Sequence, residues 1–267
     1  MMNILCPTDF SENSCFAVEY AVNLTNILGG RIHFLTTFTV PRATGSFRKF
    51  DTEIRQTVEE ELSKFSEQYS SLIKSNQTPV MSVVEGSPGD EILNYAKKHN
   101  IDLIIMGTQG SSDMRTVLFG SVTKKVFENT KVPVLAIPAV TREVLTGNRI
   151  LLSLDDKEVN NKNLFGVLKF LIEKLNTKMD IIHVSSPDSY IAFTNETIKY
   201  LEDITENLIE LHHEDPVLAI RNYIEHSDVG ILVMIRRHHS FWERLFVQTN
   251  TTAELFASNV PILMLPE

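Results

Sequence analysis

The sequence has little cysteine, no long hydrophobic run and no excess of positive charge, and each shortage excludes a class of protein. The two cysteines, Cys6 and Cys15, have neither CxxC spacing nor enough partners for a disulfide framework. No stretch approaches the roughly 18 apolar residues of a membrane span. The opening residues MMNILCPTDF lack the basic segment and apolar core of a secretory signal. We therefore expect a cytoplasmic protein that does not enter a membrane.

Basic residues are scarce relative to acidic ones. The net charge of −9 argues against a nucleic-acid partner, because no basic face is evident that could neutralise phosphates. Residues 1–140 hold 13 lysines and arginines against 15 acidic residues, whereas residues 141–267 hold 12 against 19. The second half is therefore the poorer candidate for binding an anion.

The chain is long enough for two domains of about 130 residues, and its second half repeats the first. ILCPTD at 4–9 matches ILLSLD at 150–155, and residues 87–106 align without a gap on residues 215–234. A period this long is unlike a solenoid repeat and indicates duplication of a whole domain. The two predicted domains span residues 1–140 and 148–267.

Each half alternates apolar runs with helical patterns, which predicts an α/β fold. The run at 102–107 is continuous, as in a parallel strand covered on both faces. Ser11 and Gly29 bracket a helical pattern as its two caps. Strand–helix alternation with right-handed crossovers gives a doubly wound parallel sheet in each half. The five strands predicted for the first half are 3–8, 32–38, 80–84, 102–107 and 134–137.

The connection after the strand at 102–107 contains the strongest functional signal, a G-x2-G-x9-G-S motif formed by Gly107, Gly110, Gly120 and Ser121. The first two glycines let the backbone turn and let a ligand approach closely. Gly120-Ser121 opens a helical pattern, where free N–H groups and the helix dipole favour an anion. Strand–helix connections usually run about 2–6 residues, so this longer one predicts a phosphate-binding loop. The alternative is a surface loop whose glycines serve only turns.

With this motif the chain resembles the universal stress protein family, in its nucleotide-binding branch. The resemblance implies two tandem five-stranded domains of strand order 3-2-1-4-5, an adenine nucleotide alpha hydrolase-like fold. It also implies ATP, or AMP or ADP, as the ligand, with or without Mg2+. In that order strands 1 and 4 are neighbours, and ligands bind at their carboxyl ends because the connections diverge there. The segment 7–9 and the glycine motif should therefore meet at one crevice.

The candidate nucleotide-binding residues come from the ends of these strands and from the glycine motif. In the family pattern, Asp9 accepts a hydrogen bond from the adenine amino group or a ribose hydroxyl, and Phe38 lies against the base. Two alternatives stay open, Asp9 as a cap of the following helix and Phe38 as a core residue. The candidates are Pro7, Thr8, Asp9, Phe38, Met106, Gly107, Thr108, Gln109, Gly110, Gly120, Ser121, Val122 and Thr123.

The second half lacks the motif. At the aligned positions Ile235 replaces Gly107, His238 replaces Gly110 and Gln248 replaces Gly120, and only Thr249 keeps the hydroxyl of Ser121. A branched isoleucine blocks both a left-handed turn and close approach of a nucleotide. We expect a structural or regulatory second domain.

Some polar clusters of the second half can be interpreted either as ordinary structural residues or as ligand-binding residues. None of the histidines has a recognised ligand spacing such as HExxH, so solvated or hydrogen-bonded side chains are favoured over a metal site. Arg236-Arg237 is predicted to lie in a solvated loop; the alternative is that the pair binds a small anion. The histidines concerned are His183, His212, His213, His238 and His239.

Three classes of function are compatible with this sequence. We favour a nucleotide-binding regulatory or stress-response module that holds its nucleotide in the first domain. The second class is a slow ATPase or phosphotransferase; GxxxxGK[ST] and an obvious Walker B carboxylate are absent from the sequence, and we name no catalytic residue. The third is an interaction protein with a vestigial nucleotide site, which suits the second domain better than the first.

Strand 5 of each half, at 132–137 and 260–265, lies at a sheet edge in the implied order. Bare apolar edges invite pairing with other chains, and the proline near the start of each strand is tolerated at an edge. We therefore expect the two edges to pair antiparallel. This arrangement forms an internal pseudo-dimer and leaves other surfaces for any homodimer.

Overall fold

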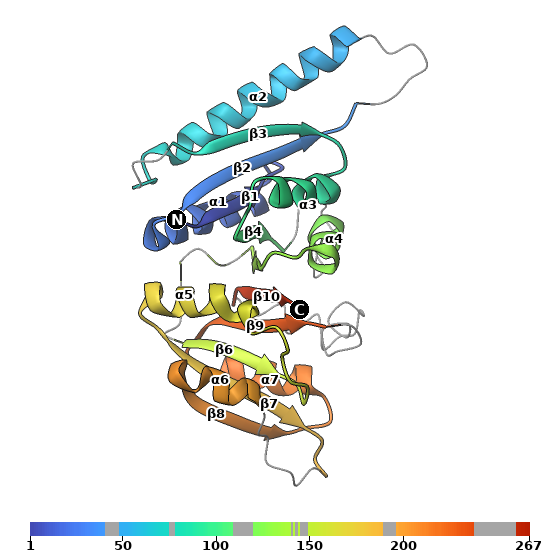
Figure 1. The fold of residues 1–267 in the computed structure, drawn as a ribbon. Coiled ribbons are helices and arrows are strands. Elements are labelled where there is room, and N and C mark those ends of the chain that lie inside the picture. Colours follow the sequence, from blue (N-terminus) through green and yellow to red (C-terminus); the bar gives the residue numbers. More distant parts are fainter. Residues whose placement is uncertain are drawn as a thin grey trace.

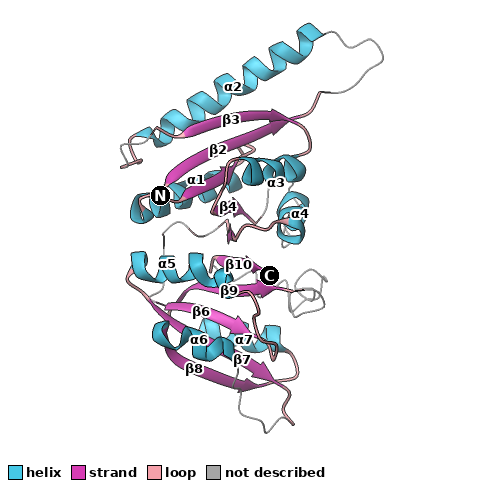
Figure 2. Ribbon diagram, viewed as in Figure 1, coloured by secondary structure: helices cyan, strands magenta, loops and turns pink. Residues whose placement is uncertain are grey.

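The structure of the chain is a computed structural model. It describes residues 1–40, 48–74, 78–108, 120–139, 141, 144, 149–188, 196–237 and 260–267, with the side chains of residues 48–51 left undescribed. Ten strands form one continuous sheet that has helices on both faces (Figure 1). Figure 2 shows that strands and helices alternate from β1 to β5 and from β6 to β9, as the sequence predicted.

The strands of the two halves follow the same order. The sheet runs β3-β2-β1-β4-β5-β10-β9-β6-β7-β8, so each half has the expected 3-2-1-4-5 arrangement. Neighbouring strands within a half are parallel. The strands of the first half agree with the predicted ones to within one residue at each end. The strand bounds are β1 Asn3–Pro7, β2 Arg31–Phe38, β3 Val80–Glu85, β4 Leu103–Gly107, β5 Val134–Ile137, β6 Arg149–Leu154, β7 Lys178–Ser185, β8 Thr205–His212, β9 Val229–Arg236 and β10 Ile262–Pro266.

The helices divide between the two faces of the sheet. Helices α1, α2, α5 and α6 bury apolar side chains against one face, and α3, α4 and α7 bury theirs against the other. The continuous apolar strands are covered on both sides as a result. The helix bounds are α1 Glu12–Leu28, α2 Arg48–Ser70, α3 Pro88–Lys98, α4 Ser121–Asn129, α5 Gly166–Leu175, α6 Glu196–Leu201 and α7 Pro216–Glu225.

Helix α1 shows how local sequence sets the ends of an element. The Ser11 hydroxyl accepts a hydrogen bond from the Ser14 N–H and so caps the first turn. Gly29 ends the helix at φ 67°, a left-handed conformation in which a side chain would be strained, and its N–H bonds the Thr25 carbonyl. Both predicted caps are therefore confirmed.

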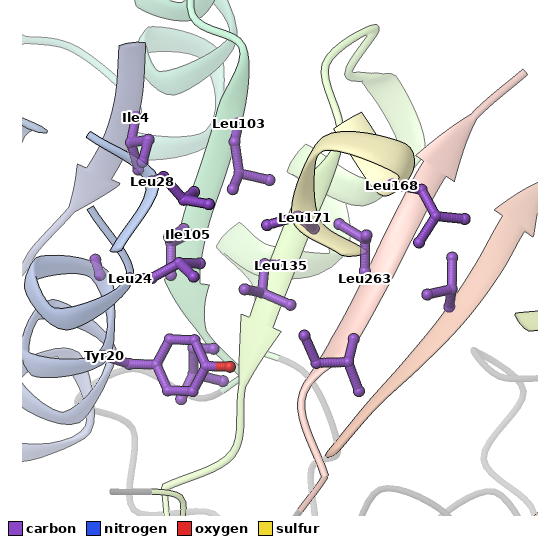
Figure 3. Packing of buried hydrophobic residues seen from close by; sticks show 14 of the residues in the cluster. Ile4, Tyr20, Leu24, Leu28, Leu103, Ile105, Leu135, Leu168, Leu171 and Leu263 are labelled. Carbon is purple, nitrogen blue, oxygen red and sulfur yellow. The ribbon is translucent and has the colours of Figure 1, made fainter. Parts of the chain in front are cut away.

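The two halves join through β5 and β10. These strands pair antiparallel, with Leu263 opposite Leu135, as the apolar edges predicted. Both leucines are fully buried, and Leu168 and Leu171 of α5 belong to the same cluster (Figure 3). Helices α1 and α5 also contact each other across the junction. The antiparallel pairing predicted for the two edge strands is thus confirmed, and the hydrophobic cluster on each face of the sheet contains residues of both halves.

The described residues bear only in part on two further expectations, the domain limits and the lack of a membrane span. The segment between the two predicted domains is described at residues 138, 139, 141 and 144, so the domain limits at 140 and 148 stay a prediction. None of the described helices combines the length and the apolar character that crossing a membrane requires.

Candidate functional site

A cavity of about 370 Å3 opens at the carboxyl ends of β1 and β4, where the connections of the first half diverge. Two groups of predicted site residues, residues 7–9 and residues 106–123, line it together although they are far apart in the sequence. Those predicted residues are Pro7, Thr8, Asp9, Met106, Gly107, Gly120, Ser121, Val122 and Thr123. The crevice expected from the strand order therefore exists, and the volume lies within the roughly 300–1,000 Å3 usual for small-molecule sites.

The start of α4 forms one wall of this cavity. The Gly120 N–H donates to the Thr108 carbonyl at 2.8 Å, and the Thr123 hydroxyl donates to the Gly107 carbonyl at 2.9 Å. These two bonds fix the first turn of the helix on the end of β4. The N-cap residue, Gly120, has no side chain, so the N–H groups at 121–123 lack both an intrahelical acceptor and a cap from this residue. They are available to an anion.

A second helix N-terminus reaches the same cavity. Pro88, the first residue of α3, lines it together with Ile92 one turn later. The Ser87 side chain at the N-cap makes no capping hydrogen bond. The positive ends of the α3 and α4 dipoles therefore face the same space, which favours negative charge there.

The two lysines that follow the motif are turned elsewhere. Lys125 donates to Asp90 of α3 at 2.6 Å, and this bond lowers the pKa of the Asp90 carboxyl. Lys124 pairs with Glu128 one turn along α4, at 3.9 Å. The Lys125–Asp90 pair thus links α4 to α3, and the Lys124–Glu128 pair stays within α4.

The segment after β1 forms the opposite wall. The Asp9 carboxylate accepts from the Ser11 N–H at 3.1 Å and from the Ser11 hydroxyl at 2.5 Å, so Asp9 braces the cap residue of α1 while it lines the cavity. Phe10 between them has φ 61°, a left-handed conformation that is strained in a residue with a side chain. The Phe10 N–H donates to the Thr8 hydroxyl at 3.0 Å, and the Phe10 ring packs on Phe65. Strain held in this way is typical of functional turns.

Several predicted residues lie away from the cavity lining. Thr108 is buried, and its main chain bonds Ile137 and Gly120. Phe38 is nearly buried under the guanidinium of Arg55, 5.5 Å from the ring centroid, and does not appear among the described lining residues. Gln109 and Gly110 lie outside the described residues.

The cavity also has lining residues that the sequence reasoning missed. Leu35 and Thr37 of β2 face it, since alternate residues of a strand share a face. The alternation was readable in the sequence, and it places Phe38 on the other face from Thr37. The additional lining residues are Ser14, Leu35, Thr37, Pro88 and Ile92.

Comparison with known proteins supplies the identification. A model of the universal stress protein family matches residues 1–138, more than half of the chain. The chain belongs to the universal stress protein family.

The family's members include relatives of single-domain length. Universal stress protein MJ0531 of Methanocaldococcus jannaschii is 28% identical over 148 residues, which cover 52% of this chain and 84% of that protein. Universal stress protein YxiE of Bacillus subtilis is 30% identical over 143 residues, 50% of this chain and 97% of that protein. A solved universal stress protein from Archaeoglobus fulgidus covers 99% of this chain and 98% of its own, with TM-score 0.72 and 22% identity. This last likeness shows that the tandem fold has a counterpart.

The equivalent crevice of the second half is smaller, about 230 Å3, and is lined by Asp155, Asp156, His183 and Ile235 among others. Helix α7 starts here, and the Asp215 side chain accepts from the N–H groups of Val217 at 2.9 Å and Leu218 at 3.3 Å. The helix N-terminus that corresponds to that of α3 is therefore capped by the chain's own carboxylate.

The interpretation of Arg236-Arg237 as a solvated loop is wrong. The Arg237 side chain is 8% exposed and forms ion pairs with Asp155 and Glu267, and it also donates to the Lys157 carbonyl at 2.8 Å. Arg236 is half-buried and bonds carbonyls at the end of α4. Asp155, the counterpart of Asp9, is thereby neutralised within the protein.

The described histidines of the second half have hydrogen-bond partners. His183 bonds Asp156 at 2.9 Å, His212 bonds Ser185 at 2.8 Å, and His213 accepts from the Asp215 N–H at 2.9 Å. Among the described residues, no group of three or more potential ligands could hold a metal ion. His238, His239, Gln248 and Thr249 lie outside the described part of the chain.

Proposed function

We propose that the chain binds one adenine nucleotide, in the crevice of the first half, and acts as a nucleotide-dependent regulatory module. One observation carries this proposal: two helix N-termini without side-chain caps at Ser87 and Gly120 open on one cavity beside a glycine strand end. Main-chain N–H groups and helix dipoles bind phosphates without a cationic side chain. Membership of the universal stress protein family supports the same ligand class.

The chemistry of the cavity wall fits the parts of a nucleotide. Leu35, Ile92 and Met106 give an apolar region suited to a base, whereas the α4 terminus suits the phosphates. Asp9 lies on the β1 side of the cavity, where a carboxylate suits the amino group of a base or a ribose hydroxyl. Asp9 is the only carboxylate among the described lining residues, so any Mg2+ would depend chiefly on the nucleotide's own phosphate oxygens.

The same wall favours a binding module over an ATPase or phosphotransferase. Phosphoryl transfer needs a base or water-positioning group and cationic charge on the transferred phosphate. Lys124 and Lys125 are engaged with Glu128 and Asp90, and Asp9 is engaged with Ser11. We therefore expect turnover well below the ~1–10³ per second typical of enzymes.

Mass spectrometry of small molecules released by denaturing the purified protein tests the proposal, followed by calorimetric titration of the stripped chain with ATP. We expect an adenine nucleotide and one site per chain. Two equivalent sites, or no binding to the stripped chain, would overturn the proposal. Fast hydrolysis that is lost in Asp9→Asn or Ser121→Ala would instead favour the enzyme.

A further inference from the structure

Arg236, at the end of β9 in the second half, reaches across the junction to the C-terminal end of α4 in the first half. Its Nη1 donates to the Phe127 carbonyl at 2.5 Å and its Nη2 donates to the Thr130 carbonyl at 2.7 Å. The last carbonyls of a helix have no donor within the helix. One guanidinium fork therefore completes the end of α4 from the other half of the chain.

The charge of Arg236 matches the place where it binds. A helix C-terminus carries partial negative charge, which a nearby cation stabilises. Burial lowers the pKa of Arg236, yet a guanidinium stays protonated at neutral pH. Its rigid, planar fork can bind two carbonyls at once, which a lysine cannot do.

Helix α4 is short, so its two ends move together. The helix has nine residues at about 1.5 Å each, and it connects the carbonyls held by Arg236 to the N–H groups that face the cavity. At the cavity end, the helix is held to Gly107 and Thr108 of the first half. Arg236 thus holds the C-terminal end of α4, and the N-terminal end of the same helix forms the cavity wall proposed to bind phosphates.

The neighbouring residue links this contact to the second crevice. Arg237 forms ion pairs with Asp155, which lines that crevice, and with Glu267. Two consecutive arginines thus bind the vestigial crevice on one side and the helix of the intact crevice on the other. A change in the second crevice that moves Arg237 would also move the backbone carrying Arg236.

We propose that Arg236 is a positioning residue through which the second half sets the affinity of the first half for the phosphates of its nucleotide. This role rests on the proposed function of the first crevice. It gives the second half a part in regulating that site although its own glycine motif is lost.

The test compares Arg236→Met and Arg236→Lys with the wild-type chain and with a control, Arg221→Gln, which removes an arginine of the second half that pairs with Glu225 within α7. Calorimetry gives the affinities for ATP and for adenosine, which lacks phosphates, and amide hydrogen exchange reports on residues 121–129. We expect Arg236→Met to weaken ATP binding at least fivefold, to leave adenosine binding within twofold and to speed exchange in α4. Arg236→Lys should recover part of the ATP affinity, and the control should match the wild type.

Each other outcome has a distinct meaning. Failure of the wild-type chain to bind ATP or adenosine would overturn the proposed function itself. Wild-type binding with unchanged ATP affinity in Arg236→Met would overturn only the role of Arg236. Equal losses for ATP and adenosine would show general loosening of the fold, and this also contradicts a phosphate-specific role. If Arg236→Met does not fold, the ATP-to-adenosine affinity ratio of Arg236→Lys decides in the same way.

Discussion

The two crevices of this molecule lie at the same position in the same fold, but they differ in whether their polar groups face the cavity or bind other residues of the protein. In the first half, the strand end at Gly107 is bare and the helix N-termini of α3 and α4 are open to the cavity. In the second half, Ile235 occupies the aligned position and Asp215 caps α7. A duplicated domain can thus keep its fold while the groups that would bind a ligand are satisfied internally.

The acidic residue after the first strand shows the same difference. Asp9 braces Ser11 and still lines the larger cavity. Asp155 is held by Arg237, whose side chain is almost buried and also pairs with Glu267. Since leaving the buried guanidinium of Arg237 without a partner would be costly, these ion pairs hold Asp155 in place, and the neighbouring Arg236 extends the contacts to the first half.

The two halves, and so the two crevices, are joined by the β5–β10 pair. Leu263→Lys tests this junction and has the largest expected effect on stability. Leu263 is fully buried opposite Leu135 in the only antiparallel pair of neighbouring strands described. Loss of the leucine costs about 2–5 kcal/mol, and the buried ammonium adds to this. We expect a much lower melting temperature and separated or aggregated halves in small-angle scattering. Leu208→Lys, on the 41% exposed Leu208 of the outer strand β8, is the matched control. A compact Leu263→Lys chain with unchanged melting would contradict the junction.

The second strand of each half carries a different buried polar group, His33 in β2 and Asp180 in β7. His33 bonds the Tyr95 hydroxyl at 3.1 Å, while Asp180 of β7 is buried beside Arg149 and Asn207. Burial, together with the charges of Arg31 and His99, lowers the pKa of His33 from 6.5 to about 4. The folded state therefore binds fewer protons than the unfolded state between these values, so this contribution to stability is complete above pH 6.5 and is lost as the pH falls towards 4.

At pH 5 this difference amounts to about 2 kcal/mol. We expect His33→Gln, which can keep a hydrogen bond to Tyr95, to lose that much less stability than the wild type between pH 7.5 and pH 5. Urea unfolding at the two pH values gives the comparison. Equal losses in both proteins would show that His33 titrates normally in the folded state.

Substitutions at the strand-end residues Gly107 and Ile235 test why one crevice is open and the other is closed. Gly107→Val places two methyl groups in the cavity, so ATP affinity should fall at least tenfold, about 1.4 kcal/mol. The fold should persist because a β-branched residue, Ile235, already stands at the equivalent strand end. Ile235→Gly should not create a second site, since Asp215 still caps α7 and Arg237 still holds Asp155. Calorimetric stoichiometry checks both, and two sites in Ile235→Gly would show that the side chain alone closed the crevice.

Local signals made most of the fold and part of the site predictable from the sequence. Ser11 and Gly29 mark the ends of α1 because capping depends on neighbouring residues. The glycine motif and the strand order together located the crevice. Thr37 was missed because its exposure to the cavity depends on the phase of β2 against its neighbours.

The pairing of the two edge strands was predictable, but the side-chain contacts of Arg236 between the halves were not. Arg236 binds carbonyls 106 and 109 positions away, and no local pattern indicates such a distant partner. An arginine pair next to a strand looks the same whether it is solvated or buried in ion pairs. The tertiary arrangement alone decides between these outcomes.

The helix caps provide the finest test of the difference between the halves. Asp215 satisfies two N–H groups of α7, so Asp215→Ala should cost about 1 kcal/mol of stability. The aligned residue Ser87 makes no capping bond, so Ser87→Ala should change the free energy of unfolding by less than about 0.5 kcal/mol. Urea unfolding of the two variants measures the contrast directly. Equal losses would mean that Ser87 caps α3 in solution, and one of the two helix N-termini assigned to the phosphates would then already be occupied by the protein's own side chain.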